Sequence, residues 1–376
     1  MTTSTRLRNN RVPCRLLSVL LFAMFVVVAL APLVVWAAPR VGEWPQAGVS
    51  VNKVGIKKVV IDDCCFPGSV RSVQLGAFGG GGNLEIGVAA QSGILLLDAA
   101  TLSRNAALDF SAPDGKQIWF GLSPYLVEDN GGFKIAKRGG GFGDVGLLDQ
   151  AGRQLWSFKP NPKLSPSRMI VDDAKEDERY YVCDRDMIYR LDRNGKVVWK
   201  VSELASHITL VRDPKSQETA FATADSSNRT LTIWTASGTR VQQLKLPFRP
   251  DGLEFVWNGE ISGFVIKSER DVAFIDRQGN HLWTHSYGDL PVVHGPFVTL
   301  VRLVSGQQPL LAVRLGSSSA TGRSILTLFS LTGTVVYNEY LGTGSGLGTA
   351  PVPNEDRERL LTGDGTSKLL LYEVLP

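Results

Sequence analysis

The sequence has few of the residues and motifs that carry catalysis or metal binding. It contains only four histidines and four cysteines. It has no nucleophile elbow, phosphate-binding loop, zinc-ligand signature or Cys-x-x-Cys pair. It also lacks a stretch that combines basic and aromatic residues, which nucleic-acid-binding surfaces use. We therefore expect no catalytic residue, no cofactor, no metal site and no nucleic acid partner.

Acidic residues are absent from the first 38 positions, and the last 23 of these carry no charge at all. Four arginines lie within residues 1–15, and the apolar run Leu16–Ala38 follows. As a helix this run would be about 34 Å long, enough to cross a bilayer core. A basic segment followed by an apolar run indicates export. Residues 1–38 are thus predicted to be an uncleaved membrane anchor through residues 16–38, or a signal cleaved near Val35–Ala37. Either way residues 39–376 lie outside the cytoplasm.

The net charge of +4 comes entirely from this N-terminal segment. Without it, residues 39–376 hold 36 basic and 36 acidic side chains. A formally neutral domain gives no reason to expect an anionic partner.

Cysteine usage adds one open question. Cys14 precedes the apolar run, so it is not a lipoprotein cysteine. Cys64, Cys65 and Cys183 lie in the exported part, where disulfides are permitted. Adjacent cysteines rarely bridge each other, because their side chains diverge in a strand. We expect three buried thiols, and a bridge from Cys64 or Cys65 to Cys183 stays open as an alternative.

A repeated pattern organises the rest of the chain. Each copy has an apolar strand end, a turn with a glycine, an apolar residue three positions later and usually an aromatic residue next. The five copies are Leu147–Phe158, Arg190–Val201, Ile233–Leu244, Phe274–Ser286 and Leu328–Tyr340. Their glycines, 41 to 54 residues apart, are Gly152, Gly195, Gly238, Gly279 and Gly333. Each copy reads as a β-hairpin, and a period of this length indicates the blades of a β-propeller.

Two partial copies extend the series and suggest how the ring closes. Gly93–Leu102 has the strand and Asp98 but lacks the glycine. Lys368–Leu375 matches the strand before the turn, after which the sequence provides no returning strand. We expect Val54–Ile61 to supply that missing outer strand. The predicted fold is all-β, a single propeller over residues 39–376, most simply of seven blades, with six or eight as alternatives, preceded by a hydrophobic helix.

The Asp-x-x-Gly-x-x-Leu-Trp units resemble the repeats of quinoprotein-type (PQQ-like) β-propellers. The resemblance covers roughly residues 93–342 and implies the fold more strongly than an activity, because such propellers include both quinone-dependent dehydrogenases and non-enzymatic scaffolds. The metal-ligating carboxylate and amide set and the stacking aromatic of a quinone site are not found in this sequence. The resemblance therefore does not extend to a PQQ cofactor.

A second resemblance lies in Gly76–Ala89, which is similar to an FG-GAP repeat with its calcium-binding loop. Positions 77, 79 and 81 hold alanine and glycines where that loop has aspartates, and only Glu85 keeps a carboxylate. Calcium needs about six to eight oxygen ligands. We expect no bound calcium in this loop, and none in a second degenerate copy of the repeat at Glu128–Gly132.

The histidines are separated by the predicted strands. His281 and His285 share one strand face about 13 Å apart, too far for one zinc ion. His207 and His294 each precede an apolar segment with the tetrapeptide Thr-Leu-Val-Arg, at Thr209–Arg212 and Thr299–Arg302. Inner propeller strands often begin in this way, so these two histidines could reach a central site. Ordinary partly buried histidines are the simpler interpretation.

Several segments are candidates for connecting loops. The acidic run Asp172–Glu178 reads as a solvated loop between strands. The long units 98–149 and 279–333 and the segment Gly342–Pro353 are further candidates for ligand-binding loops, because loops on a rigid ring commonly carry binding sites.

The sequence favours an exported, non-catalytic propeller that binds a protein or another extracytoplasmic ligand, with its membrane contact through residues 16–38. One alternative is an extracytoplasmic hydrolase or lyase that uses His207 or His294 at the channel. A second is a calcium-dependent adhesion module of the FG-GAP type.

Overall fold

A computed structural model describes most of the chain after residue 50. The described residues are 51–52, 55–63, 69–90, 93–110, 124–137, 144–160, 168–173, 178–212, 220–257, 261–288, 292–317, 323–342, 344, 346–366 and 368–374. They form strands, and none of these residues is helical. In this part of the chain no helix is long and apolar enough to cross a membrane. The predicted export segment 1–38, with Leu16–Ala38, and the pair Cys64 and Cys65 lie outside it.

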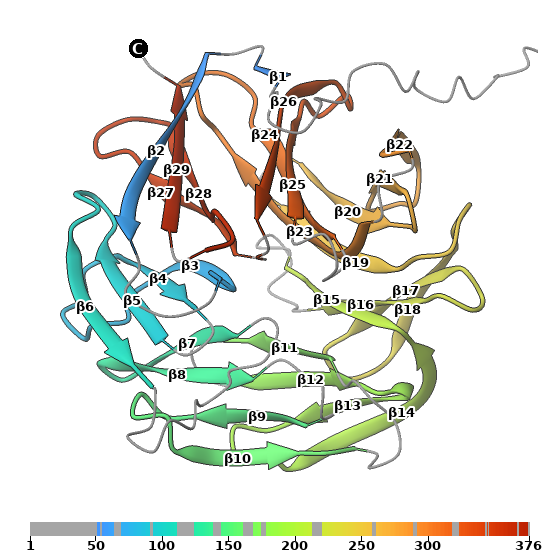
Figure 1. Cartoon of the computed structure of the whole chain (residues 1–376). Helices are drawn as coiled ribbons and strands as arrows, with labels where there is room; N and C mark the ends of the chain where they lie inside the picture. The colour runs from blue at the N-terminus through green and yellow to red at the C-terminus, as the bar shows by residue number, and fades with distance from the viewer. Residues whose placement is uncertain are drawn as a thin grey trace, which may run out of the picture. The chain divides into compact units, whose positions relative to one another are not determined.

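Seven antiparallel sheets form a ring, and we number them as blades 1 to 7 in chain order (Figure 1). Blade 1 comprises β3 (Ser72–Gly76), β4 (Glu85–Ala89), β5 (Gly93–Asp98) and β6 (Arg104–Asp109). Blade 2 comprises β7 (Tyr125–Asp129), β8 (Gly132–Lys137), β9 (Val145–Leu148) and β10 (Gln154–Phe158). Blade 3 comprises β11 (Arg168–Asp172), β12 (Arg179–Cys183), β13 (Arg185–Leu191) and β14 (Val197–Ala205). Blade 4 comprises β15 (His207–Val211), β16 (Ala220–Asp225), β17 (Thr230–Thr235) and β18 (Arg240–Lys245).

The remaining blades follow the same order from an inner to an outer strand. Blade 5 comprises β19 (Gly252–Trp257), β20 (Ser262–Lys267), β21 (Asp271–Asp276) and β22 (His281–Ser286). Blade 6 comprises β23 (Val292–Val301), β24 (Leu310–Ser317), β25 (Arg323–Phe329), β26 (Val335–Gly342) and the short β1 (Val51–Asn52). Blade 7 comprises β27 (Leu347–Pro351), β28 (Glu358–Gly363), β29 (Lys368–Val374) and β2 (Ile56–Asp63). The prediction of a seven-bladed, all-β propeller is confirmed.

The ring closes by the predicted exchange of an outer strand. β2 pairs antiparallel with β29, from Ile56 opposite Val374 to Asp63 opposite Lys368. Upstream of it, β1 adds a fifth strand to blade 6, with Val51 opposite Asn338. β1 and β2 therefore join the last two blades. The repeat pattern does not predict the pairing of β1.

The apolar core lies between neighbouring blades. Middle strands such as β4 and β5 bury almost every residue, because both faces of the sheet pack against another sheet. Between blades 3 and 4, Tyr181 stacks on Phe221 with ring centroids 4.7 Å apart, and Phe221 stacks on Trp234 at 6.0 Å. A single blade could not bury these two faces alone, which is why the repeats fold only as a ring.

Each repeated hairpin contains a β-bulge just after its turn. In blades 1 to 6 the register between the third and fourth strands shifts just after the turn, leaving one outer-strand residue without a direct partner. In blades 2 to 5 this residue is the exposed apolar one of the motif: Leu155, Val198, Val241 and Leu282. The next residue then faces the following blade. Trp156 Nε1 donates to Arg193 O (3.1 Å), Trp199 Nε1 to Ala236 O (3.3 Å) and Trp283 Nε1 to Leu331 O (3.0 Å).

These tryptophans pack against the glycines of the following hairpins, where a Cβ atom would crowd the indole ring. This contact gives a first prediction. Gly195 has φ +75°, and a Cβ there would lie 2.7 Å from the Trp156 ring. We expect Gly195→Ala to lower the free energy of unfolding by about 2–4 kcal/mol, since backbone strain and a side-chain clash add. Gly306→Ala is the matched control, because Gly306 has φ +72° with nothing within 4 Å of its Cβ position. Equal losses for the two variants in urea unfolding would show that the tryptophan contact is unimportant.

Two other expectations can be compared with the structure. Cys183 has a free, buried thiol, and burial raises its pKa to about 12. The segment Gly342–Pro353 is not a loop, because Leu347–Pro351 forms the inner strand β27. Its glycines permit close packing: a Cβ at Gly348 would lie 2.7 Å from Val73 O of blade 1. The glycine-rich composition predicts a loop. In the structure these glycines instead allow the inner strands β27 and β3 to approach each other closely.

Candidate functional site

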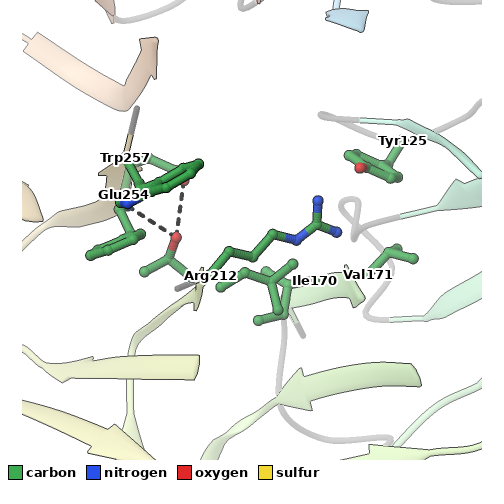
Figure 2. A pocket seen from close by; sticks show the side chains of 9 residues that line it. Tyr125, Ile170, Val171, Arg212, Glu254 and Trp257 are labelled. Atoms are coloured by element: carbon green, nitrogen blue, oxygen red, sulfur yellow. Dashed lines mark hydrogen bonds between the residues drawn. The ribbon is translucent and has the colours of Figure 1, made fainter. Parts of the chain in front are cut away.

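A cavity of about 300 Å³ opens where the inner strands of blades 2 to 5 meet. It is lined by Tyr125, Ile170, Val171, Thr209, Leu210, Arg212, Glu254, Phe255 and Trp257. The inner strand β15 contacts β11 and β19, and the cavity brings together residues more than 120 positions apart. Figure 2 shows Tyr125 on one side of this cavity, Glu254 and Trp257 on the other, and Arg212 extending between them.

Arg212 is the cation of the cavity and is held by a carboxylate. Its guanidinium contacts Asp173, the residue after β11, and Tyr125 Oη donates to Asp173 Oδ2 at 3.3 Å. Burial lowers the pKa of Arg212, but the negative charge and hydrogen bond of Asp173, together with Tyr125 and Asp172, make the net shift upward. Arg212 is therefore positively charged at neutral pH, with its charge balanced locally.

The opposite wall combines a carboxylate with an exposed aromatic ring. Thr209 Oγ1 donates to Glu254 Oε2 at 3.2 Å and accepts from the Phe255 backbone N–H at 3.2 Å, as the dashed lines in Figure 2 show. These bonds join β15 to β19 and hold Glu254 in place. Trp257, at the end of β19, keeps 38% of its surface exposed. A large aromatic ring left accessible beside a cavity is typical of a contact surface for a ligand.

Further ion pairs connect charged residues of blades 2 and 3. Lys134 Nζ lies 3.3 Å from Asp129 and 3.2 Å from Glu178, and Arg179 lies 4.0 Å from the buried Asp172. The charged residues that line the cavity itself are Arg212 and Glu254.

The predicted loop Asp172–Glu178 does connect two strands, β11 and β12, although residues 174–177 lie outside the described part. Its first residue departs from the prediction. Asp172 ends β11 and is only 2% exposed, so it is a buried strand residue and not part of a solvated loop. The charge pattern could not show this, since burial depends on the neighbouring blade.

None of the histidine side chains that the structure describes lines the cavity. His207 begins the inner strand β15, as expected, but it is buried and does not line the cavity. Burial, together with the positive charges of Arg168 and Lys267, holds the pKa of His207 well below its ordinary value. The backbone of His294 lies in the inner strand β23, and its side chain falls outside the described residues.

The other two histidines occupy the outer strand β22. His281 Nε2 hydrogen-bonds Thr284 Oγ1 at 2.7 Å. His285 packs edge-on against Tyr287 and Phe329, and burial lowers its pKa to about 4. Both make contacts within the blade or with its neighbour, as their interpretation as structural residues requires.

Glu85 and Glu128, the carboxylates of the two degenerate FG-GAP-like segments, form hydrogen bonds within the protein. Glu85 Oε1 accepts from Asn105 Nδ2 at 2.8 Å, and Glu128 Oε1 accepts from the Ala77 N–H at 2.7 Å. Among the described residues no three His, Cys, Asp or Glu side chains converge as metal ligands do.

The cavity residues were missed by sequence reasoning, although one signal was present. The tetrapeptide Thr209–Arg212 had been singled out only for the histidine before it, yet Thr209 and Arg212 themselves line the cavity. Tyr125, Glu254 and Trp257 lie in ordinary strand patterns that do not distinguish them. Their common site exists because four inner strands, β7, β11, β15 and β19, contribute to one cavity. Its paired ions, fixed carboxylate and accessible ring can hold a small polar group.

Comparison with known proteins agrees with the fold. No protein-family model matches the sequence, and no curated protein matches it either. Among solved structures, BBS1N in complex with ARL6DN has a TM-score of 0.53 and 12% identity, covering 88% of this chain and 98% of that one. Virginiamycin B lyase from Staphylococcus aureus has a TM-score of 0.53 and 12% identity, covering 85% of this chain and 99% of that one. At this identity the likeness shows a shared architecture, and the chain is a β-propeller.

Proposed function

We propose that the chain is an exported, non-catalytic β-propeller that binds a protein or another extracytoplasmic ligand at the cavity between blades 2 and 5. The observation that carries the proposal is the exposed Trp257 beside a cavity whose polar walls are already fixed by hydrogen bonds and an ion pair. Preorganised walls with an accessible aromatic ring favour binding, since little is lost in ordering them. BBS1N, a propeller solved in complex with ARL6DN, supports protein binding as a use of this architecture.

The proposal places residues 39–376 outside the cytoplasm, tethered through residues 16–38 or released after cleavage. Protease added to intact cells should then degrade the propeller, or the propeller should appear in the external or periplasmic fraction. Complete protection of the chain in the cytosolic fraction would contradict export.

Virginiamycin B lyase gives a specific reason to keep an enzyme as the second candidate, of the lyase or hydrolase type. That candidate would require His207 or His294 at the reacting centre. Alanine at both positions distinguishes the two functions, because an enzyme of this kind would lose turnover of its substrate, whereas ligand binding at the cavity would persist.

Trp257→Ala is expected to weaken partner binding by about 30-fold or more, since central aromatic residues commonly contribute 2 kcal/mol or more to an interface. The full chain serves as bait, and retained proteins are identified by mass spectrometry and then titrated individually. Leu282→Ala is the matched control, because Leu282 is 50% exposed on the outer strand of blade 5. A partner that binds both variants as tightly as the unchanged chain would place the binding surface elsewhere.

A further inference from the structure

We infer that the cavity receives a phenolic ring, a neutral aromatic group with one hydroxyl, such as the side chain of a tyrosine of the partner. This inference rests on the proposed function and names the chemistry of the ligand at the same cavity. Three properties of the cavity carry it: its size, its aromatic and aliphatic walls, and polar groups that are already paired with one another.

The size and the walls of the cavity suit one apolar side chain. At about 300 Å³ the cavity is at the lower limit of pockets that hold a small molecule, so a side chain fits and a folded element does not. Six of the nine lining residues are aromatic or aliphatic: Tyr125, Ile170, Val171, Leu210, Phe255 and Trp257. A group that is mostly apolar is therefore transferred from water to an apolar surface when it enters, which favours its binding.

Trp257 and Arg212 favour an aromatic ring over an aliphatic chain. Trp257 is accessible beside the cavity, and a ring packed against an indole gains more than its buried area alone provides. Arg212 extends across the cavity between Trp257 and Tyr125 (Figure 2). Its pKa is raised, so the guanidinium is charged and is attracted to the face of an aromatic ring. A ring bound between Trp257 and Arg212 would contact both groups.

The polar groups of the walls favour a neutral ligand. Arg212 contacts Asp173, and Thr209 Oγ1 donates to Glu254 Oε2 at 3.2 Å. Both charged side chains of the lining thus have a partner within the protein. A neutral ligand leaves these pairs intact, whereas a charged ligand would compete with them, and breaking such a pair is costly.

The protein already binds one phenol at this ion pair. Tyr125 Oη donates to Asp173 Oδ2 at 3.3 Å, beside the contact between Asp173 and Arg212. A guanidinium has five N–H donors, and a carboxylate engages at most two of them. The side chain of Arg212 is also 49% exposed. A hydroxyl on the ligand can therefore accept a hydrogen bond from Arg212, and a phenol is the aromatic group that provides one.

The experiment titrates the full chain with small probes followed by saturation-transfer difference NMR. The probes are N-acetyl-tyrosine methylamide, the matching phenylalanine and leucine derivatives, and p-cresol. We expect the phenylalanine probe to bind about threefold more tightly than the leucine probe, because only a ring stacks on Trp257. The tyrosine probe should bind tighter by a further factor of about three, because its hydroxyl accepts a hydrogen bond from Arg212.

Two variants assign these preferences to named side chains. Trp257→Leu should abolish the preference for the phenylalanine probe over the leucine probe. Arg212→Met should abolish the preference for the tyrosine probe over the phenylalanine probe, since methionine fills similar space without a donor. Arg240→Met is the matched control and should change neither preference, because Arg240 is 48% exposed and paired with Glu203 much as Arg212 is paired with Asp173. Unchanged melting temperatures verify that each variant folds, and Trp257→Leu alone keeps the test decisive if Arg212→Met does not.

The arms separate the source of the phenol from failure of the inference. Tighter binding of the tyrosine probe than of p-cresol identifies a protein side chain, and equal or tighter binding of p-cresol identifies a free phenol; both support the site. The inference is overturned if no probe binds, if the tyrosine probe binds no more tightly than the phenylalanine or leucine probe, or if the preferences survive in the folded variants. Partner binding that still depends on Trp257 in that case leaves the proposed function standing. Partner binding that does not depend on Trp257 contradicts the function itself.

Discussion

Arg314→Ala is expected to cause the largest loss of stability of any single substitution in this propeller, about 3–5 kcal/mol in the free energy of unfolding. Arg314 lies in β24 and is fully buried. Its guanidinium donates to Ser324 Oγ (3.0 Å) and Gly342 O (3.2 Å) of blade 6, and to Gly363 O (2.7 Å) and Thr362 Oγ1 of blade 7.

This arginine has no carboxylate among its hydrogen-bond partners, so its contribution comes from bridging two blades with a planar set of donors. Burial lowers the pKa of Arg314 to about 10, and the side chain is still protonated at neutral pH. Alanine would remove the bridge, leave carbonyl oxygens without their donor and open a cavity between the sheets. Blades 6 and 7 are also the blades that the N-terminal strands complete, so their separation would open the ring.

Chemical unfolding in urea measures the loss of stability, and three further variants identify its cause. Arg314→Met fills most of the space without donating, Arg314→Lys keeps the charge without the planar fork, and both should be destabilised. Arg153→Ala is the exposed control: its side chain is 82% exposed and pairs with Asp149, so we expect a change within about 0.5 kcal/mol. An Arg314→Ala variant as stable as Arg153→Ala would refute the bridging role.

Removal of β2 is expected to open the propeller. A chain beginning at residue 64 should lose cooperative unfolding or melt far below a chain beginning at residue 56, which retains β2. The strand contributes the buried Ile56 and the partly buried Val59 and Ile61, together with a ladder along β29. Burial of three such side chains corresponds to about 4–8 kcal/mol, which is comparable with the entire stability of a typical domain.

The exposed edge of β29 makes a second observable. An unpaired edge strand promotes association, so the shorter chain should form oligomers in size-exclusion chromatography with light scattering. A synthetic peptide of residues 51–63 added in trans should restore the monomer and raise the melting temperature. Identical melting of the two chains would mean that β2 does not close the ring.

The fold was accessible from sequence because its signals are local and recur. Each hairpin has its own determinants: Asp149 Oδ1 accepts from Ala151 N at 2.9 Å, and Asp192 Oδ1 accepts from Asn194 N at 2.9 Å, as the side-chain-to-backbone turns predict. Five repetitions at a blade-like interval identified a propeller, and the incomplete last copy indicated which strand must complete it. The prediction of seven blades and of closure by the segment after residue 54 followed from these signals.

The candidate site could not be predicted from local sequence patterns. Tyr125, Arg212, Glu254 and Trp257 come from three blades, and no local rule separates them from other residues of the inner strands. Likewise Arg314 interrupts the apolar strand Leu310–Leu315, a signal that could have indicated a buried polar role but not its partners. Gly342–Pro353 was misassigned because glycine marks both turns and close strand packing, and only the neighbouring blade shows which applies.

The sequence by itself determined the period, the hairpins and the neutrality of the domain outside the N-terminal segment, and it favoured seven blades over six or eight. These properties are set by side chains acting on their own backbone within a few residues. The tertiary structure alone decided which carboxylates are buried and which aromatic ring stays accessible. Those depend on contacts between blades far apart in the chain, and closure of the ring is the physical event that creates them.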